Sequence, residues 1–210
     1  MTGPTHRQYS ICLGLITLVI LYIYNITNVN YYLALPIILM ASKSGALFPD
    51  VDHHWEAVHD KTVVNKIINV IIHITGGKHR SWQTHSIDLC LYFTTAAYLV
   101  PTVLYNKGII SCTNMEVAVL LLLGFASGWI SHLFSDMLTS AGVRLICFLP
   151  KSKISLVPKK IGKLRFNTGH EWEAFNFKII RVINIVLGIY TLIYPFIINN
   201  TISKIIEAWR

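Results

Sequence analysis

The sequence predicts an all-α membrane protein, a polytopic bundle of about five transmembrane helices with an additional interfacial amphipathic helix. The mean hydropathy is +0.53, and 53% of the 210 residues are hydrophobic. Only 13% of the residues are charged, whereas soluble domains carry about 25%. Long apolar runs recur along the chain with polar segments between them. We therefore expect a single membrane-embedded domain over residues 1–210.

The apolar runs predict where the spans lie. The first run, Ile11–Tyr24, is shorter than the roughly 17–25 residues of a transmembrane helix, so we expect its helix to cover residues 8–26. No small-x-small cleavage site follows Tyr24, which favours a retained helix over a cleaved signal peptide. The remaining runs predict spans over residues 31–48, 86–105, 116–138 and 179–198.

Two segments between the spans have different patterns. Lys61–Ile74 repeats apolar residues at helical spacing and places its polar residues on the opposite side. This pattern predicts an amphipathic helix that lies on the membrane surface. Residues 140–177 are basic and punctuated by Gly and Pro, and we interpret them as a cytoplasmic loop. Its stretch Lys151–Arg165 would lie against anionic lipid headgroups.

The distribution of basic residues predicts the orientation. With the N-terminus in the cytoplasm, the predicted spans place all but three of the 18 basic residues on the cytoplasmic side, the exceptions being Lys107, Lys204 and Arg210. This bias follows the positive-inside rule. It also accounts for the net charge of +8, so we expect membrane lipids around the protein and no nucleic-acid partner.

The cysteines of this chain show no pattern of a disulfide or metal site. The four cysteines are widely spaced and form no CxxC pair: Cys12, Cys90, Cys112 and Cys147. Cysteines inside apolar runs usually behave as small hydrophobic residues. We expect neither a disulfide framework nor a thiolate metal site.

Imidazole and carboxylate side chains stand at span ends that the predicted topology places together. His6 precedes the first span, and Asp50 and Asp52 follow the second. His79 and His85 precede the third span, and the fourth ends with His132 and Asp136. Ionisable groups at such depth are costly unless they pair, bind a metal or serve function. We therefore predict that these scattered residues meet at the cytoplasmic face.

The residue types in this group indicate metal chemistry. His132 and Asp136 are four residues apart on a helix, so both side chains can reach one ion. Of Asp50 and Asp52, one would bridge ions and the other would orient a ligand. Nitrogen and oxygen ligands without thiolates suit zinc, manganese or iron, and zinc is the commonest choice for a His/Asp mixture. Two or more divalent ions could bind, and Arg80 would suit a phosphate oxygen.

Other histidines have simpler explanations. A single histidine at a helix end is more often an interfacial or capping residue than a ligand, which applies to His6, His54, His59 and His73. His73 falls on the apolar side of the amphipathic segment, so it is left out of the site. His170 and Glu171 begin a pattern similar to HExxH, but Ala174 stands where the second histidine is required.

Several short motifs occur in a characteristic order: Thr5-His6, Phe48-Pro49-Asp50-Val51-Asp52-His53, His79-Arg80, Thr84-His85-Ser86, Ser131-His132, Asp136, Thr139 and Gly142. Each motif is weak alone, but their order resembles the YdjM family over about residues 1–175. Members of that family are bacterial inner-membrane proteins described as membrane-bound metal-dependent hydrolases, some of them under LexA control. The family is grouped with zinc-dependent phospholipase C and P1-type nucleases.

The resemblance implies a mostly helical fold with a multi-metal phosphoesterase site in the inner membrane. The ligands that it implies are His6, Asp50 or Asp52, His53, His79, His85, His132 and Asp136. We take both Asp50 and Asp52 into the metal set, and we expect Asp52 and Arg80 to serve catalysis.

From these observations we expect a membrane-bound metal-dependent hydrolase at the cytoplasmic face. A metal-activated hydroxide would attack a phosphoester or a lipid-type ester, and the substrate would be a small molecule or a lipid. A metal carrier or a non-catalytic metal-binding membrane protein is the alternative, and a scaffold whose helix ends are joined by metal is a third. Carriers hold ions near the bilayer midplane, whereas these candidates stand at span ends, which favours catalysis or structural metal.

Overall fold

The computed structural model describes residues 1–54, 58, 61–80, 82–139, 141–143, 146, 154–156, 169 and 171–208. This part of the chain forms six α-helices and one short 3₁₀ helix: α1 (Gly3–Ile23), α2 (Tyr31–Leu47), η1 (Pro49–Asp52), α3 (Val63–Ile74), α4 (Ile87–Asn106), α5 (Cys112–Met137) and α6 (Glu171–Ala208). Five helices are long and apolar enough to cross a membrane, namely α1, α2 with η1, α4, α5 and the first 26 residues of α6. The prediction of an all-helical membrane protein is confirmed.

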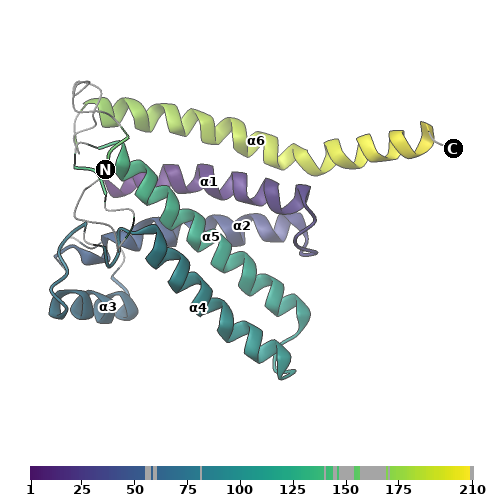
Figure 1. The fold of residues 1–210 in the computed structure, drawn as a ribbon. Helices are drawn as coiled ribbons and strands as arrows, with labels where there is room; N and C mark the ends of the chain where they lie inside the picture. The colour runs from purple at the N-terminus through teal and green to yellow at the C-terminus, as the bar shows by residue number, and fades with distance from the viewer. Residues whose placement is uncertain are drawn as a thin grey trace.

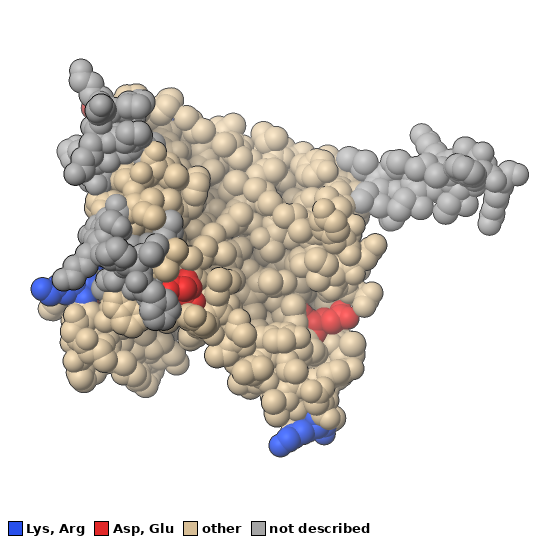
Figure 2. Space-filling model, in the orientation of Figure 1, with Lys and Arg blue, Asp and Glu red and all other residues tan. Residues whose placement is uncertain are grey.

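The spans alternate in direction, so one end of the bundle collects parts of the chain that are far apart in sequence (Figure 1). The start of α1, the end of α2, the start of α4, the end of α5 and the start of α6 all lie there, and α3 lies beside them. We call this the site end and the opposite one the distal end. In Figure 2, charged side chains lie toward the two ends, with a broad uncharged band between them.

Glycines let α2 and α5 pack with their backbones in close contact. A Cβ atom added at Gly128 would lie 1.9 Å from the carbonyl oxygen of Ser42, and one at Gly45 would lie 2.0 Å from that of Phe125. Small residues of this kind allow close helix pairs in membranes, where packing replaces the hydrophobic effect as the driving force. His132 lies one turn after Gly128, so this glycine seam brings α5 directly against the end of α2 and η1.

An aromatic cluster fills the space between the seam and α4. Trp129 is fully buried, and its ring lies 4.7 Å from Phe48 and 5.9 Å from Phe93, centroid to centroid. The indole Nε1 of Trp129 donates to the carbonyl oxygen of Thr84 at 2.8 Å. The cluster therefore attaches the segment before α4 to the inner face of α5.

The boundaries of the first and last spans were predicted incorrectly. α1 begins at Gly3 and not at residue 8, so His6 lies inside the helix. α6 begins at Glu171 and not at residue 179, inside the segment 140–177 that we interpreted as a loop. Pro4 in the first turn of α1 favours a helix start, and two acidic residues in the first turn of α6 complement its dipole.

A contact between these two helix starts explains both errors. The carboxylate of Glu173 is buried and accepts hydrogen bonds from the backbone N–H of Thr2 at 2.6 Å and of Gly169 at 2.8 Å. The remaining predicted spans agree with the helices to within a few residues. Most of the segment 140–170 lies outside the described residues, including His170 and all of the basic stretch from Lys151 to Arg165 except residues 154–156.

Helix α3 is amphipathic, as predicted, and its polar side faces the protein. Asn65, Asn69 and Ile72 are buried, whereas Val63 and Ile74 on the opposite side are 76% and 80% exposed. The side-chain amide of Asn69 donates to the carbonyl oxygens of the η1 segment, with its bond to that of His53 measuring 2.8 Å. Its apolar side remains available for the membrane surface, where we predict that it lies.

Candidate metal centre

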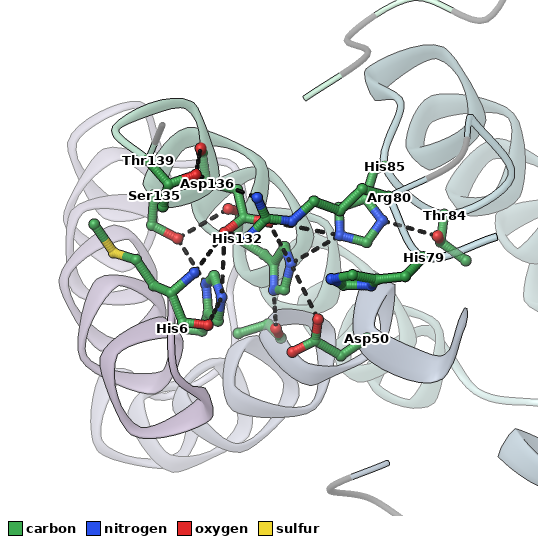
Figure 3. Close-up of polar contacts among 12 residues, drawn as sticks. His6, Asp50, His79, Arg80, Thr84, His85, His132, Ser135, Asp136 and Thr139 are labelled. Carbon is green, nitrogen blue, oxygen red and sulfur yellow. Dashed lines mark hydrogen bonds and ion pairs between the residues drawn. The ribbon is translucent and has the colours of Figure 1, made fainter. Parts of the chain in front are cut away.

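Four chain segments supply a buried cluster of imidazoles and carboxylates at the site end (Figure 3). They are the first turns of α1, the 3₁₀ helix η1 with the residue after it, the segment 79–85, and the last turns of α5. The cluster brings together every metal residue predicted from the sequence: His6, Asp50, Asp52, His53, His79, His85, His132 and Asp136. Within it, four overlapping groups of three residues have ligand atoms within 4.8 Å of one another.

The centre of the cluster is formed by His85, His132 and Asp136. The Nε2 atoms of the two histidines lie 3.2 Å apart, and Asp136 Oδ2 lies 3.6 Å from that of His132 and 3.7 Å from that of His85. Asp50 approaches from η1, with its Oδ1 3.7 Å from His132 Nε2. All three central side chains are at most 1% exposed, so water does not screen these charges.

The hydrogen bonds of the two central histidines determine where a neutral ring carries its proton. His132 Nδ1 lies 2.7 Å from the carbonyl oxygen of Ala46, which can only accept. His85 Nδ1 lies 3.1 Å from a carboxylate oxygen of Asp52, which also accepts. Each ring therefore holds its proton on Nδ1 and directs the lone pair of Nε2 toward the other ring.

When both rings are neutral, this arrangement places electron pairs together without a hydrogen between them. The two Nε2 lone pairs face each other, and Asp136 Oδ2 is buried with no hydrogen-bond partner in the described part of the chain. Buried acceptors that lack a donor are costly, and a cation between them would satisfy all three. The residues present therefore fit a divalent metal, on their geometry and on their donor types.

His6 extends the central group from α1. Its ring stacks on that of His132, with centroids 3.7 Å apart and planes at 13°. Its Nδ1 lies 2.7 Å from the hydroxyl oxygen of Ser135, and that hydroxyl donates to the carbonyl oxygen of His132 at 2.9 Å. His6 Nε2 lies 3.2 Å from the carbonyl oxygen of Met1, which can only accept, and 3.5 Å from Asp136 Oδ1.

A second group lies on the η1 side of the cluster. His79 Nδ1 lies 2.9 Å from Asp52 Oδ1, and the rings of His79 and His53 stack with centroids 3.6 Å apart. His53 Nε2 lies 3.8 Å from Asp50 Oδ1, so Asp50 stands between the two groups. The side chains of His53 and His79 are about a third exposed, at 36% and 35%, so this side of the cluster opens toward the surface.

Arg80 connects two of the three carboxylates of the cluster, those of Asp52 and Asp136. Its backbone N–H donates to Asp52 Oδ2 at 2.9 Å, and its guanidinium donates to Asp136 Oδ1 at 3.0 Å and to Thr139 Oγ1 at 3.3 Å. The backbone φ of Arg80 is 60°, in the left-handed region that residues other than glycine rarely adopt. The amino group of Met1 donates to the same Asp136 oxygen at 2.8 Å. Both cations contact Oδ1, which leaves Oδ2 to face the histidines.

Burial lowers the pKa of His85, because a charged imidazole loses its hydration there, while Asp52 opposes this shift. Burial and the neighbouring His79 also lower the pKa of His53. A lowered pKa favours the neutral imidazole, which is the form that binds metals. At neutral pH both side chains therefore have a lone pair to offer.

Several residues that support the cluster were not predicted as site residues. Thr84, Ser135 and Trp129 contact the histidines or their neighbours, and the carbonyl of Ala46 sets the tautomer of His132. Thr84 and Ser135 adjoin predicted ligands in sequence, which was the available signal. Among the other histidines, His54 is exposed, His59 lies outside the described residues, and His73 bonds the carbonyl oxygen of Asn69 on its own helix.

The chain matches one known protein family. A family model described as YdjM inner membrane protein matches residues 1–209. The chain belongs to the YdjM family. Membership agrees with the five candidate spans, and the protein is a multi-pass membrane protein. No curated protein and no solved structure matches the chain.

Proposed function

We propose that the protein is a membrane-bound metal-dependent hydrolase that cleaves a phosphoester or a lipid-type ester. One observation supports this proposal above the others. The Nε2 atoms of His85 and His132 converge on Asp136 Oδ2 in a buried site, and that oxygen has no hydrogen-bond partner among the described residues. A cluster of free lone pairs at one helix end is the environment that a catalytic metal requires.

The side chains divide into a central set and an outer set. His6, Asp50, His85, His132 and Asp136 would hold the first ion, and Asp50 with His53 and His79 could hold a second one. Imidazole and carboxylate ligands without thiolate suit zinc best, with manganese and iron as further choices. When bound, divalent metals supply Lewis-acid chemistry, since they make water nucleophilic near neutral pH and stabilise charge on phosphoryl oxygens.

Arg80 is placed to bind the substrate. Its side chain is 11% exposed and reaches Asp136, so its positive charge lies beside the central group. Its Nε is buried and has no hydrogen-bond partner in the described part of the chain. A guanidinium binds phosphate oxygens through two parallel hydrogen bonds. Arg80 would therefore orient a phosphoryl group and stabilise charge as it develops on the oxygens.

The position of the cluster favours hydrolysis over transport. It lies at one end of the bundle, where five helix ends meet (Figure 1), and its η1 side opens toward the surface. Carriers hold ions near the middle of the membrane on interrupted helices. At the end of the bundle, the site can instead receive the polar part of a membrane lipid or a small phosphoester from the adjoining aqueous side. The positive-inside pattern indicates that this side is the cytoplasm.

The proposal is tested with purified protein in detergent or nanodiscs. Elemental analysis should find a divalent metal, and the protein should hydrolyse a phosphodiester probe or phospholipid vesicles. His132→Ala should lose the metal and the hydrolysis together. His73→Ala is the matched control, since His73 lies on α3 and bonds only a backbone carbonyl in the described structure. Metal binding without hydrolysis of any ester would contradict the proposed hydrolase activity and would indicate a non-catalytic metal-binding protein.

A further inference from the structure

Both oxygens of Asp52 accept hydrogen bonds from the protein. Its Oδ1 accepts from His79 Nδ1 at 2.9 Å. Its Oδ2 accepts from the backbone N–H of Arg80 at 2.9 Å and from the hydroxyl of Thr84 at 2.5 Å, and it lies 3.1 Å from His85 Nδ1. The carboxylate is 1% exposed, so these donors and not water satisfy its charge. A metal on Oδ2 would have to displace one of its donors, and a metal on Oδ1 would share that oxygen with His79.

The carboxylate of Asp136, another member of the cluster, differs in this respect. Asp136 also has one oxygen that accepts from cations, but its Oδ2 is buried and lacks a donor among the described residues. That oxygen faces the Nε2 atoms of both central histidines. The free oxygen of Asp136 is placed as a ligand, whereas Asp52 lies behind His85, on the Nδ1 side of the ring.

We propose that Asp52 is a positioning residue and not a ligand. It keeps the proton of His85 on Nδ1 and thereby directs the lone pair of Nε2 into the centre. This inference rests on the proposed metal site. A carboxylate behind a metal-binding histidine fixes the tautomer and the ring orientation, and raises the basicity of the ligand nitrogen. His79 is held by the same carboxylate in the same way, so one aspartate orients two imidazoles.

Thr84 adds an independent requirement for the same tautomer. Its hydroxyl has one proton, which it donates to Asp52 Oδ2. The hydroxyl oxygen also lies 2.9 Å from His85 Nδ1, and there it can only accept. Nδ1 of His85 thus has two acceptors beside it and must carry hydrogen. Trp129 holds the Thr84 carbonyl at 2.8 Å, so the aromatic cluster fixes this network in place.

The first test compares metal binding by the full-length protein in nanodiscs, with zinc and cobalt(II) as the probes. Asp52→Asn should still bind the same number of ions, with affinity about 10–100-fold weaker, and its cobalt absorption spectrum should keep the wild-type shape. Asp136→Asn should lose the central ion. If Asp52→Asn instead loses an ion as Asp136→Asn does, with an altered cobalt spectrum, Asp52 is a ligand. An unchanged affinity would also overturn the proposal.

The second test reads the tautomer directly and requires neither metal nor hydrolysis. In metal-free protein with ¹⁵N-labelled histidine, solid-state NMR should find His85 protonated on Nδ1, and this signal should shift in Asp52→Asn. A wild-type His85 protonated on Nε2 would overturn the inference. If the tautomer is as expected but no metal binds, then the proposed function fails and the hydrogen-bond assignment stands.

Thr84 provides a milder variant in case Asp52→Asn does not fold. Thr84→Val removes the hydroxyl while keeping the shape of the side chain, and should weaken zinc binding several-fold without changing the number of ions. Thr84→Ser restores the hydroxyl and should recover the wild-type affinity. Equal affinities for the valine and serine variants would contradict the role given to this network.

Discussion

The two ends of α5 carry carboxylates in opposite environments. At the distal end, Glu116 accepts from the backbone and side-chain amides of Asn28 at 3.2 and 3.1 Å, and these contacts are exposed. At the site end, Asp136 is 1% exposed and one of its oxygens has no donor within the described structure. The first carboxylate accepts from Asn28 at an exposed contact, whereas the second depends on cations that the protein or a ligand must supply. One end of α5 should therefore tolerate loss of its carboxylate, whereas the other end should not.

This comparison depends on the glycine seam between α2 and α5. The largest expected effect comes from placing a larger side chain in that seam. In Gly128→Val the side chain would overlap the Ser42 carbonyl, because even a Cβ atom would lie 1.9 Å from that oxygen. Neither backbone can move without separating α2 from α5. We expect a loss of folded protein, measured as the folded fraction in size-exclusion chromatography and by thermal unfolding.

Gly188 on α6 is the matched control for this variant. A Cβ at Gly188 would meet nothing within 4 Å. Gly188→Ala should leave the unfolding temperature unchanged or raise it, since alanine favours a helix over glycine by about 1 kcal/mol. A Gly128→Val protein as stable as the wild type would mean that α2 and α5 are not in the contact described.

The next largest effect separates the two ends directly. Asp136→Asn removes the charge that faces His85 and His132, so metal affinity should fall by more than about 100-fold, which is about 2.7 kcal/mol. Glu116→Gln makes the same chemical change at a half-buried residue whose hydrogen bonds are exposed, and it should leave affinity within about two-fold, because surface charges contribute about 0–1 kcal/mol. Isothermal titration with zinc measures both. Equal losses from the two variants would remove the distinction between the ends.

A smaller effect on binding, but a large one on turnover, is expected from Arg80. Arg80→Lys keeps a positive charge near Asp136 but loses the planar pair of donors. Metal content should remain at the wild-type level, while hydrolysis of a phosphodiester should fall by about 100-fold, in the range seen when one charge-stabilising donor is lost. Full activity in the lysine variant would show that Arg80 serves charge balance and does not orient the substrate.

The sequence was sufficient for the arrangement of spans and for the identity of the clustered residues. Alternation of apolar runs fixes which helix ends share a side, so His6, Asp50, His85 and Asp136 could be predicted to meet although they are far apart in the chain. The spacing of His132 and Asp136 placed both on one face of α5. These inferences depend on local periodicity, which the sequence displays directly.

The details that depend on long-range contacts could not be predicted. The helix starts at Gly3 and Glu171 reflect the contact between Glu173 and Thr2, and neither segment reveals this partner. The roles of Asp50 and Asp52 look equivalent in the sequence, because only the hydrogen bonds from residues 79–85 show that the oxygens of Asp52 are occupied. The position of the proton on the His132 ring depends on a backbone carbonyl oxygen, and the sequence does not show which carbonyl lies beside the ring.

The final prediction concerns which side of the membrane each end faces. Cys112 is exposed at the distal end, whereas Thr75 is exposed at the site end just after α3. In a protein whose other cysteines are replaced by alanine, we expect a membrane-impermeant maleimide to label Cys112 in intact cells. With Cys112 also replaced, Thr75→Cys should react only after the inner membrane is opened, because the positive-inside pattern places the site end in the cytoplasm. The reverse labelling would mean that the site end faces away from the cytoplasm. Labelling of both positions in intact cells would mean that the two ends are not separated by a membrane, and the comparison between them would lose its basis.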